Sequence, residues 1–211
     1  MSIPRTITVG LVLVVALLGA GAWWFLRDDA PAEADLATAV ESVQDEAGSS
    51  STTAGDEGVA GTWTVDTETG DFTYESATGT FAGFRIEEEL AAIGSTTAVG
   101  RTDAVTGEVA IEGSTLTAAA FEVDLTTITT ETSMRDDQVQ RALETDTHPT
   151  ATFSLTEPVE LGSGAATGEP IAVTAEGELT VHGVTRPVEL AIEAQLVDGT
   201  VVLVATTEVT F

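Results

Sequence analysis

The sequence predicts an all-β, antiparallel domain of about eight strands over residues 61–211, with one short helix. A transmembrane helix and an acidic linker are predicted to precede it. Apolar and polar residues alternate with a period of two in most segments after residue 60, and punctuation by Gly, Pro or Asp-Gly separates these segments. No crossover helices lie between them, which indicates an antiparallel meander that closes as a sandwich or a barrel.

The first element is an uncharged apolar stretch, ITVGLVLVVALLGAGAWWFL, over residues 7–26. As a helix it would span about 30 Å, which matches the hydrocarbon core of a bilayer. Arg5 precedes it, so residues 1–6 are expected in the cytoplasm and the rest of the chain outside. The chain is therefore expected to be a single-pass membrane protein.

The alternative for this segment is a cleaved signal peptide, because Ala30-Pro31-Ala32 has the small-x-small form of a cleavage site. The apolar stretch is longer than a signal-peptide core of about 7–15 residues, which favours a retained anchor. Cleavage would make the protein secreted. Both alternatives place the domain outside the cytoplasm.

Residues 27–60 carry nine acids against one arginine and few large apolar side chains. Such a segment buries too little apolar surface to offset its ordering entropy, so a disordered acidic linker is predicted. A short helix is considered over Asp35 to Glu46. The domain is expected to begin at residue 61.

The alternating segments of the domain follow one another with clear turn signals between most of them. Asp198-Gly199 is a two-residue hairpin signal, and Gly113, Gly162 and Gly183 with Pro187 are expected at other turns. The segments read as strands are GTWTVD, FRIEEEL, EVAIEG, STLTAAAFEVDLTTI, TATFSLTEPVEL, IAVTAEGELTVHG, RPVELAIEAQL and VVLVATTEVTF.

One interruption is helical. Ser133 and Asp136 have the spacing of a capping box, and Arg141 lies near the other end, where a helix dipole favours a cation. Met134, with Val139, Ala142 and Leu143, gives the helix a partial apolar face. We expect it to lie across one end of a barrel.

Composition excludes several classes of function. The chain has 211 residues, a net charge of −28 and no cysteine, so nucleic-acid binding, a disulfide framework and Cys-ligated zinc are disfavoured. His148 and His182 show no metal-motif spacing, and His182 is expected to be a turn residue. No GxSxG elbow is present, which disfavours a hydrolase. No catalytic residue, metal or cofactor is predicted.

Two stretches carry a family resemblance: SMRDDQVQRALETDTHPTATFSLTEP and GELTVHGVTRPVEL. With the opening Trp63-Thr-Val-Asp66 they resemble the YceI-like family, also called polyisoprenoid-binding YceI domains, over nearly all of residues 61–211. The resemblance implies a lipocalin-like, antiparallel eight-stranded barrel that holds an isoprenoid lipid without catalysis. Family members usually continue past the strand resembling VATTEVTF, so either a truncated sequence or a barrel open at one seam is expected.

The resemblance also implies roles for individual residues. The apolar positions expected to line the lumen and contact the lipid are Phe84, Ile86, Val109, Ile111, Phe121, Val123, Leu125, Phe153, Leu155, Leu179, Val181, Val188, Leu190 and Ile192. The motif positions expected to be structural are Arg135, Asp136, Arg141, Pro149, Gly183, Thr185 and Pro187. Gly183 and Pro187 are expected to shape a turn, and Arg135 with Asp136 to latch the helix to the barrel rim.

Two functions from different classes follow. The first is a membrane-anchored, extracytoplasmic protein that holds a polyprenyl or isoprenoid quinone chain in its lumen, with the lipid and the membrane as its partners. The alternative is a non-catalytic structural or interaction module of the cell envelope that has the fold but no functional pocket. A lumen filled by the protein's own side chains would favour the alternative.

Overall fold

The computed structural model of the chain describes residues 30–47, 58–90 and 94–209. The chain divides into two compact units, one that holds Ile86–Ala98 and a larger one that holds the described residues of 31–85 and 99–209. The described elements are α2 (Leu36–Ala47), β1 (Gly61–Thr64), β2 (Ala82–Leu90), β3 (Gly94–Thr102), β4 (Val105–Glu112), β5 (Thr115–Asp124), η1 (Leu125–Thr127), α3 (Ser133–Ala142), β6 (Thr150–Leu155), β7 (Val159–Glu160), η2 (Ala165–Thr167), β8 (Ile171–Val181), β9 (Val184–Val197) and β10 (Thr200–Thr206).

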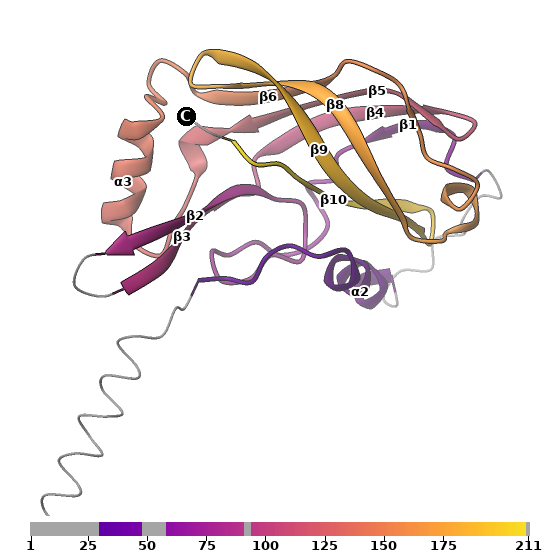
Figure 1. The fold of residues 1–211 in the computed structure, drawn as a ribbon. Coiled ribbons are helices and arrows are strands. Elements are labelled where there is room, and N and C mark those ends of the chain that lie inside the picture. The colour runs from indigo at the N-terminus through magenta and orange to yellow at the C-terminus, as the bar shows by residue number, and fades with distance from the viewer. Residues whose placement is uncertain (1–29, 48–57, 91–93, 210–211) are drawn as a thin grey trace, which may run out of the picture. The chain divides into compact units, whose positions relative to one another are not determined.

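The larger unit is built on one eight-stranded antiparallel sheet. Its strands follow the order β1-β4-β5-β6-β8-β9-β10, and the short β7 pairs with β5 beside this path. The sheet curls into a half-barrel, with β4, β5 and β6 on one side and β8, β9 and β10 on the other (Figure 1). The predicted antiparallel, mostly β architecture is therefore confirmed.

The sheet is not a closed barrel in the described residues, because the two end strands, β1 and β10, do not pair with each other; of the expected alternatives, it corresponds to a barrel open at one seam. A barrel closes only when its first and last strands bond along their length. β1 ends at Thr64, and the Asp66 carboxylate then accepts hydrogen bonds from the backbone N–H groups of Glu68 at 2.8 Å and Thr69 at 3.2 Å. Among the described residues, neither β1 nor the turn that follows it pairs with β10.

Two-residue turns set the register of the long hairpins. His182 and Gly183 join β8 to β9 with φ angles of 53° and 70°, and Asp198 and Gly199 join β9 to β10 with 49° and 84°. Positive φ at both positions gives the twist that suits two antiparallel strands. The predicted turns at Gly183 and Asp198-Gly199 are confirmed, and His182 is a turn residue as expected.

A bulge interrupts the β4–β5 ladder. Ala110 pairs with Ala118, whereas Ile111 pairs with Leu116, so Thr117 is an extra residue on β5. The Thr117 hydroxyl donates to the Ala110 carbonyl at 3.2 Å. The bulge changes the alternation, and Leu116 is consequently buried with 7% exposure although simple alternation from Phe121 would turn it outward.

The helix α3 begins as predicted at Ser133, but its cap is one residue earlier. The side chain of Thr132 accepts a hydrogen bond from the Arg135 backbone N–H at 3.4 Å. Thr132 has extended backbone angles, as an N-cap residue requires, whereas Ser133 is already helical. The predicted capping box is thus replaced by a threonine cap.

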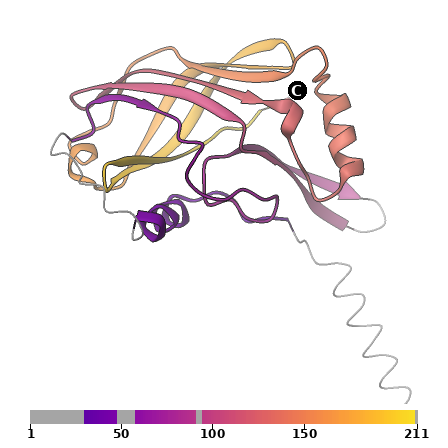
Figure 2. The same cartoon turned by 180° about the vertical axis from the view of Figure 1, so that it is seen from behind.

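The predicted apolar face of α3 is only partly present. Met134 is 73% exposed, and no residue of this helix is fully buried. The helix is held instead by Gln140, whose amide donates to the backbone carbonyls of Leu125 at 3.0 Å and Thr126 at 3.2 Å. Figure 2 shows α3 standing at one end of the curled sheet, as predicted for the single short helix of the domain.

The helix α2 lies in the segment predicted to be a linker, close to the short helix considered there. It contacts β9 and β10. On β10, Val202 is paired with Gln195 and is 7% exposed, whereas its neighbour Leu203, on the opposite face, is 39% exposed. The outer face of β10 is therefore the better buried one, because α2 covers it. Domain limits at residues 27, 60 and 61 stay predictions.

Two further expectations have different outcomes. The predicted transmembrane helix at residues 7–26 lies outside the described residues. Among the helices that the structure describes, none is long and apolar enough to cross a bilayer.

The strand β3 was not predicted, because its sequence GSTTAVGRT has small and polar side chains where alternation would show large apolar ones. It pairs with β2 in a separate two-stranded sheet.

Candidate functional site

The candidate binding surface is the inward face of the curled sheet. Strand register places side chains from neighbouring strands side by side, and Phe121 on β5 is opposite Phe153 on β6, which is opposite Leu179 on β8. The row continues to Gly107 on β4. Successive rows repeat this arrangement because every second residue of each strand points to the same face. An apolar surface thus spans β4 to β9.

Two glycines give the aromatic rings of this surface their room. A methyl group at Gly107 would lie 2.4 Å from the Phe121 ring, and one at Gly177 would lie 2.3 Å from the Phe153 ring. Carbon atoms do not approach so closely without displacement, so each ring occupies the space that its glycine leaves free. The two phenylalanines therefore lie flat along the sheet.

The structure brings together most of the residues predicted to line the lumen. Of the residues that it brings together, which are named next, all but Ile111 and Phe153 are half-buried, so water reaches their side chains in the absence of a ligand. The predicted residues on the inward face of the sheet are Val109, Ile111, Phe121, Val123, Phe153, Leu155, Leu179, Val181, Val188, Leu190 and Ile192.

Three predicted lining residues lie elsewhere. Leu125 is buried in η1, beyond the end of β5, and its N–H donates to the carbonyl of the motif residue Pro149 at 2.8 Å. Phe84 lies on β2, half-buried and in close approach to Gly100. Ile86, also on β2, is 51% exposed and belongs to the smaller unit. These three residues are not part of the inward face of the sheet.

One end of the inward face is filled by the protein itself. The indole N–H of Trp63 donates to the Val59 carbonyl at 2.9 Å, which fixes the segment before β1 in this position. The half-buried residues Val109, Phe121 and Leu155 pack against the same core. The buried cluster consists of Val59, Ile111, Leu116, Ala119, Leu161 and Ala165. The apolar surface is therefore closed at this end.

Two arginines hold the segment that precedes α2. Arg85 donates to the Pro31 carbonyl and Arg101 to the Ala32 carbonyl, each at 2.5 Å. Arg101 is 7% exposed and its guanidinium lies 4.9 Å from the centre of the Phe81 ring. Burial, and secondarily repulsion from Arg85, lower the pKa of Arg101 below its ordinary value. These cations are used to bind backbone, in a chain that has few cations.

Two surface hollows lie away from the apolar face. One of about 280 Å³ is lined by polar residues at the end of α3 and in the loop after it, among them Gln140 and Glu144. The other, of about 440 Å³, lies between the start of α2 and the strands β8 and β9, at Leu36, Ala172 and Glu193. The first has no apolar lining of the kind that a hydrocarbon chain requires, whereas the second combines apolar residues, among them Pro170 and Ile171, with Asp35 and Gln195.

The motif residues on α3 organise the start of the helix. Asp136 accepts hydrogen bonds from the N–H of Thr130 at 2.6 Å and from its hydroxyl at 2.8 Å. Arg135 forms an ion pair with Glu131 at 2.8 Å. Both contacts tie the helix to the loop before it. Arg141 is exposed and lies beside the 280 Å³ hollow.

The motif residues on the β8–β9 hairpin organise its turn end. Thr185 and Thr180 are paired across the strands, with their hydroxyl oxygens 2.8 Å apart. Pro187 was expected in the turn, but it lies within β9, opposite Glu178. Since β10 pairs only as far as Ala191, β9 has a free edge at Pro187, where a residue without an N–H is tolerated.

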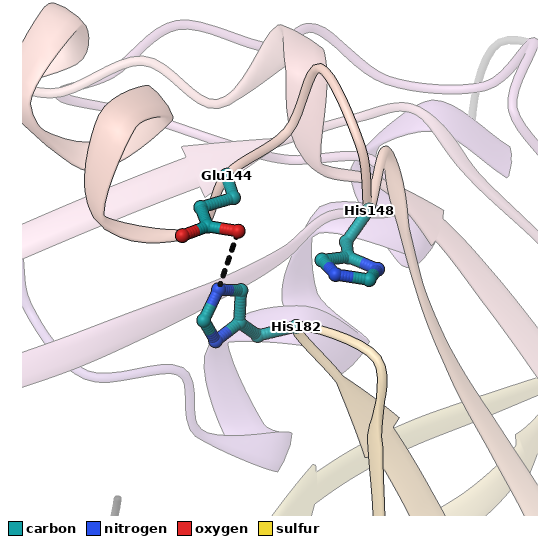
Figure 3. A group of neighbouring side chains, drawn as sticks. All are labelled: Glu144, His148 and His182. Atoms are coloured by element: carbon teal, nitrogen blue, oxygen red, sulfur yellow. Dashed lines mark ion pairs between the residues drawn. The ribbon is translucent and has the colours of Figure 1, made fainter.

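One cluster was missed by the sequence interpretation. Glu144, His148 and His182 come together although 38 residues separate the first from the last (Figure 3). Glu144 Oε2 lies 3.5 Å from His182 Nε2, and the two imidazole rings are edge to face with centroids 5.3 Å apart. No short-range spacing could reveal the cluster, because the β8–β9 turn brings His182 to the loop that follows α3.

Comparisons with known proteins bear on the family of the chain. The family model of the YceI-like domain matches residues 63–211. A search of curated proteins finds no match. A polyisoprenoid binding domain from Saccharophagus degradans, implicated in plant cell wall breakdown, is 25% identical with a TM-score of 0.43, and the match covers 55% of this chain and 62% of that domain. BcnA from Burkholderia cenocepacia is 16% identical with a TM-score of 0.38, over 53% of this chain and 72% of BcnA. The chain thus spans less than two thirds of the first of these relatives.

Proposed function

The chain belongs to the YceI-like domain family, and from this premise we propose that its curled sheet binds the hydrocarbon chain of an isoprenoid lipid, such as a polyprenyl or isoprenoid quinone chain. The protein acts on the lipid by holding it and not by catalysis. The family is one of binding domains, and it includes polyisoprenoid-binding members.

A single observation carries the proposal: large apolar side chains on one concave face are left half-buried. Leu179, Val188 and Leu190 are examples, and each lies on the face opposite the acidic outer residues. A folded monomer rarely leaves such a contiguous apolar surface in contact with water unless something binds there. Contact with a hydrocarbon chain would remove that surface from water.

Burial of apolar surface would supply the driving force for binding, and it must exceed the entropic cost of association. At about 25 cal/mol per Å², a chain that removes about 200 Å² of apolar protein and ligand surface from water gains roughly 5 kcal/mol. The contacts are non-directional, so the inward face of the sheet recognises the length and shape of the chain more than its chemical detail. Selection for isoprenoid over straight chains would come from the fit of the methyl branches against half-buried side chains of the inward face, among them Leu179 and Leu190.

The test compares two substitutions that add the same charge to adjacent residues on opposite faces of β9. Leu190→Glu puts a carboxylate on the inward face, and Ala191→Glu puts one on the exposed outer face. The full chain in detergent is incubated with a polyprenol, and retained lipid is quantified by mass spectrometry. We expect the wild type and Ala191→Glu to retain polyprenol and Leu190→Glu to lose at least about tenfold in affinity.

Palmitate is the control for chain chemistry, and far-ultraviolet circular dichroism checks that each variant is folded. Equal retention by the two variants would place the lipid away from the sheet. Failure of the wild type to retain polyprenol, together with no co-purified lipid in its extract, would reject lipid binding altogether.

A second candidate function is a non-catalytic module of the cell envelope without a working pocket. The buried cluster around Val59 and Leu161 favours it, since this end of the inward face is already filled. In that case extraction of purified protein yields no lipid, and the half-buried apolar residues of the inward face contact a protein partner. The polyprenol experiment separates the two candidates.

We propose that the stretch at residues 7–26 anchors the protein in the membrane with the sheet domain outside the cytoplasm. Its length and lack of charge support an anchor, and Arg5 supports the orientation. Membranes from expressing cells are washed with alkaline carbonate, and in a separate experiment intact cells or spheroplasts are treated with protease from the outside. An anchored protein stays in the washed membrane and its domain is digested; release by carbonate, or protection of the domain, would contradict the proposal.

A further inference from the structure

We propose that Glu144, His148 and His182 form a binding site for one divalent transition metal ion, with zinc as the best fit. The side chains come from the loop after α3 and from the β8–β9 turn, and one ligand atom of each lies within 4.8 Å of the others. This site is separate from the apolar face, so it is independent of the proposed lipid binding.

The ligand set suits zinc. Two imidazoles and one carboxylate are a common three-residue set for zinc, with metal–ligand bonds of about 2.0–2.2 Å. Two such bonds at a tetrahedral angle place their ligand atoms about 3.4 Å apart. The observed 3.5 Å between Glu144 Oε2 and His182 Nε2 is close to this separation. Magnesium and calcium prefer oxygen ligands and are disfavoured here.

His182 Nε2 is the atom that most requires a partner. It is buried, and it has no hydrogen-bond partner in the described part of the chain. Buried polar nitrogens usually have a hydrogen-bond partner, and one without a partner in the protein is commonly bonded to an ordered water or to an ion. A metal ion between Glu144 and His182 would satisfy the nitrogen.

The backbone holds the three residues in place before any ion binds. The N–H of His148 donates to the carbonyl of Glu144 at 2.8 Å, which closes the loop between these two ligands. A methyl group at Gly183 would lie 2.5 Å from Cε1 and 2.9 Å from Nδ1 of His148, so only glycine lets this ring approach the turn. Figure 3 shows the two imidazoles and the carboxylate facing a shared space.

The site is accessible to an ion from solvent. The side chain of Glu144 is 61% exposed, and it also lines the 280 Å³ hollow beside Gln140 and Thr145. Water can therefore complete the coordination. The chain's net charge of −28 raises the local concentration of cations around it.

The experiment measures zinc binding to the full chain in detergent by isothermal titration calorimetry, with millimolar magnesium present to occupy weak carboxylate sites. The variants are His182→Asn, since asparagine tolerates the left-handed backbone of this turn, and His148→Gln. Glu157→Gln, at an exposed residue of another loop, removes one carboxylate as the control. We expect one equivalent of zinc on the wild type and the control, and at least about tenfold weaker binding to each histidine variant.

A second measurement needs no variant. The chain has two histidines, so the ring nitrogens of both are resolved by nitrogen-15 NMR, and one equivalent of zinc is expected to shift both sets of resonances. The proposal is overturned if zinc leaves these resonances unchanged, or if the double variant His148→Gln/His182→Asn binds zinc as tightly as the wild type.

Discussion

At the scale of single residues, the inward face depends on where side chains are missing. Gly177 lies on β8 with ordinary strand geometry, and its value is the space that it leaves for the ring of Phe153. Phe153 is 7% exposed and opposes both Phe121 and Leu179. Glycine usually destabilises a strand, but Gly177 provides the space in which the Phe153 ring packs flat against β8.

Substitution of this glycine tests the interpretation. We expect Gly177→Ala to lower the free energy of unfolding by roughly 2–3 kcal/mol, because the new methyl group would meet the Phe153 ring at 2.3 Å and the Ser154 carbonyl at 2.7 Å. Gly113→Ala is the control: nothing lies within 4 Å of its methyl group, and only the left-handed backbone costs, by about 1 kcal/mol. Urea denaturation measures both, and equal losses would show that the close contact with Phe153 relaxes at no cost.

At the scale of elements, what surrounds each strand decides which of its faces is buried. Alternation in VVLVATTEVTF predicts Val201, Leu203, Val209 and Phe211 on one face. In the structure Val202, on the opposite face of β10, is the buried residue, because α2 lies against the outer side of β9 and β10. Val209 follows the end of β10, and Phe211 lies outside the described residues.

The pair Val202 and Leu203 makes this difference measurable. Val202→Ala is expected to lower the free energy of unfolding by about 1–2 kcal/mol, since two buried methyl groups are lost. Leu203→Ala removes more atoms but from a side chain that is 39% exposed, so the expected loss is below about 1 kcal/mol. Thermal and urea unfolding of both variants provide the values. A larger loss of unfolding free energy for Leu203→Ala than for Val202→Ala would mean that α2 does not cover the face of β10 that carries Val202.

The difference between local sequence signals and contacts made by distant segments explains how much of the fold and of the candidate site the sequence predicts. Period-two alternation identified most strands of the sheet, and the dipeptides His182-Gly183 and Asp198-Gly199 identified two hairpins, because both signals depend on neighbouring residues alone. The bulge at Thr117, the cover over Val202 and the grouping of His148 with His182 depend on contacts between segments far apart in the chain. Local patterns contain no information about such contacts.

At the scale of the whole molecule, charge is the dominant feature. The net charge is −28, and the outer face of the sheet places Glu176 directly opposite Glu189 on β8 and β9. Like charges that face each other across strands are destabilising, and an excess of one sign repels itself throughout the folded domain. The inward face is thus an apolar surface on a strongly anionic domain.

Salt therefore should stabilise the fold. Raising potassium chloride from about 0.05 M to about 1 M shortens the screening length from more than 10 Å to about 3 Å, so repulsion between surface carboxylates is largely removed. We expect the midpoint of thermal unfolding to rise with salt.

In Glu189→Lys the repulsion with Glu176 becomes an attraction, so this variant is expected to be more stable than the wild type by about 0.5–1 kcal/mol at low salt, with a smaller gain on adding salt. Differential scanning calorimetry at both salt concentrations measures this, with Glu157→Lys, in a loop, as the matched charge reversal. If the two variants respond alike, net charge and not the cross-strand pair sets the salt dependence, and a midpoint that falls with salt contradicts the repulsion itself.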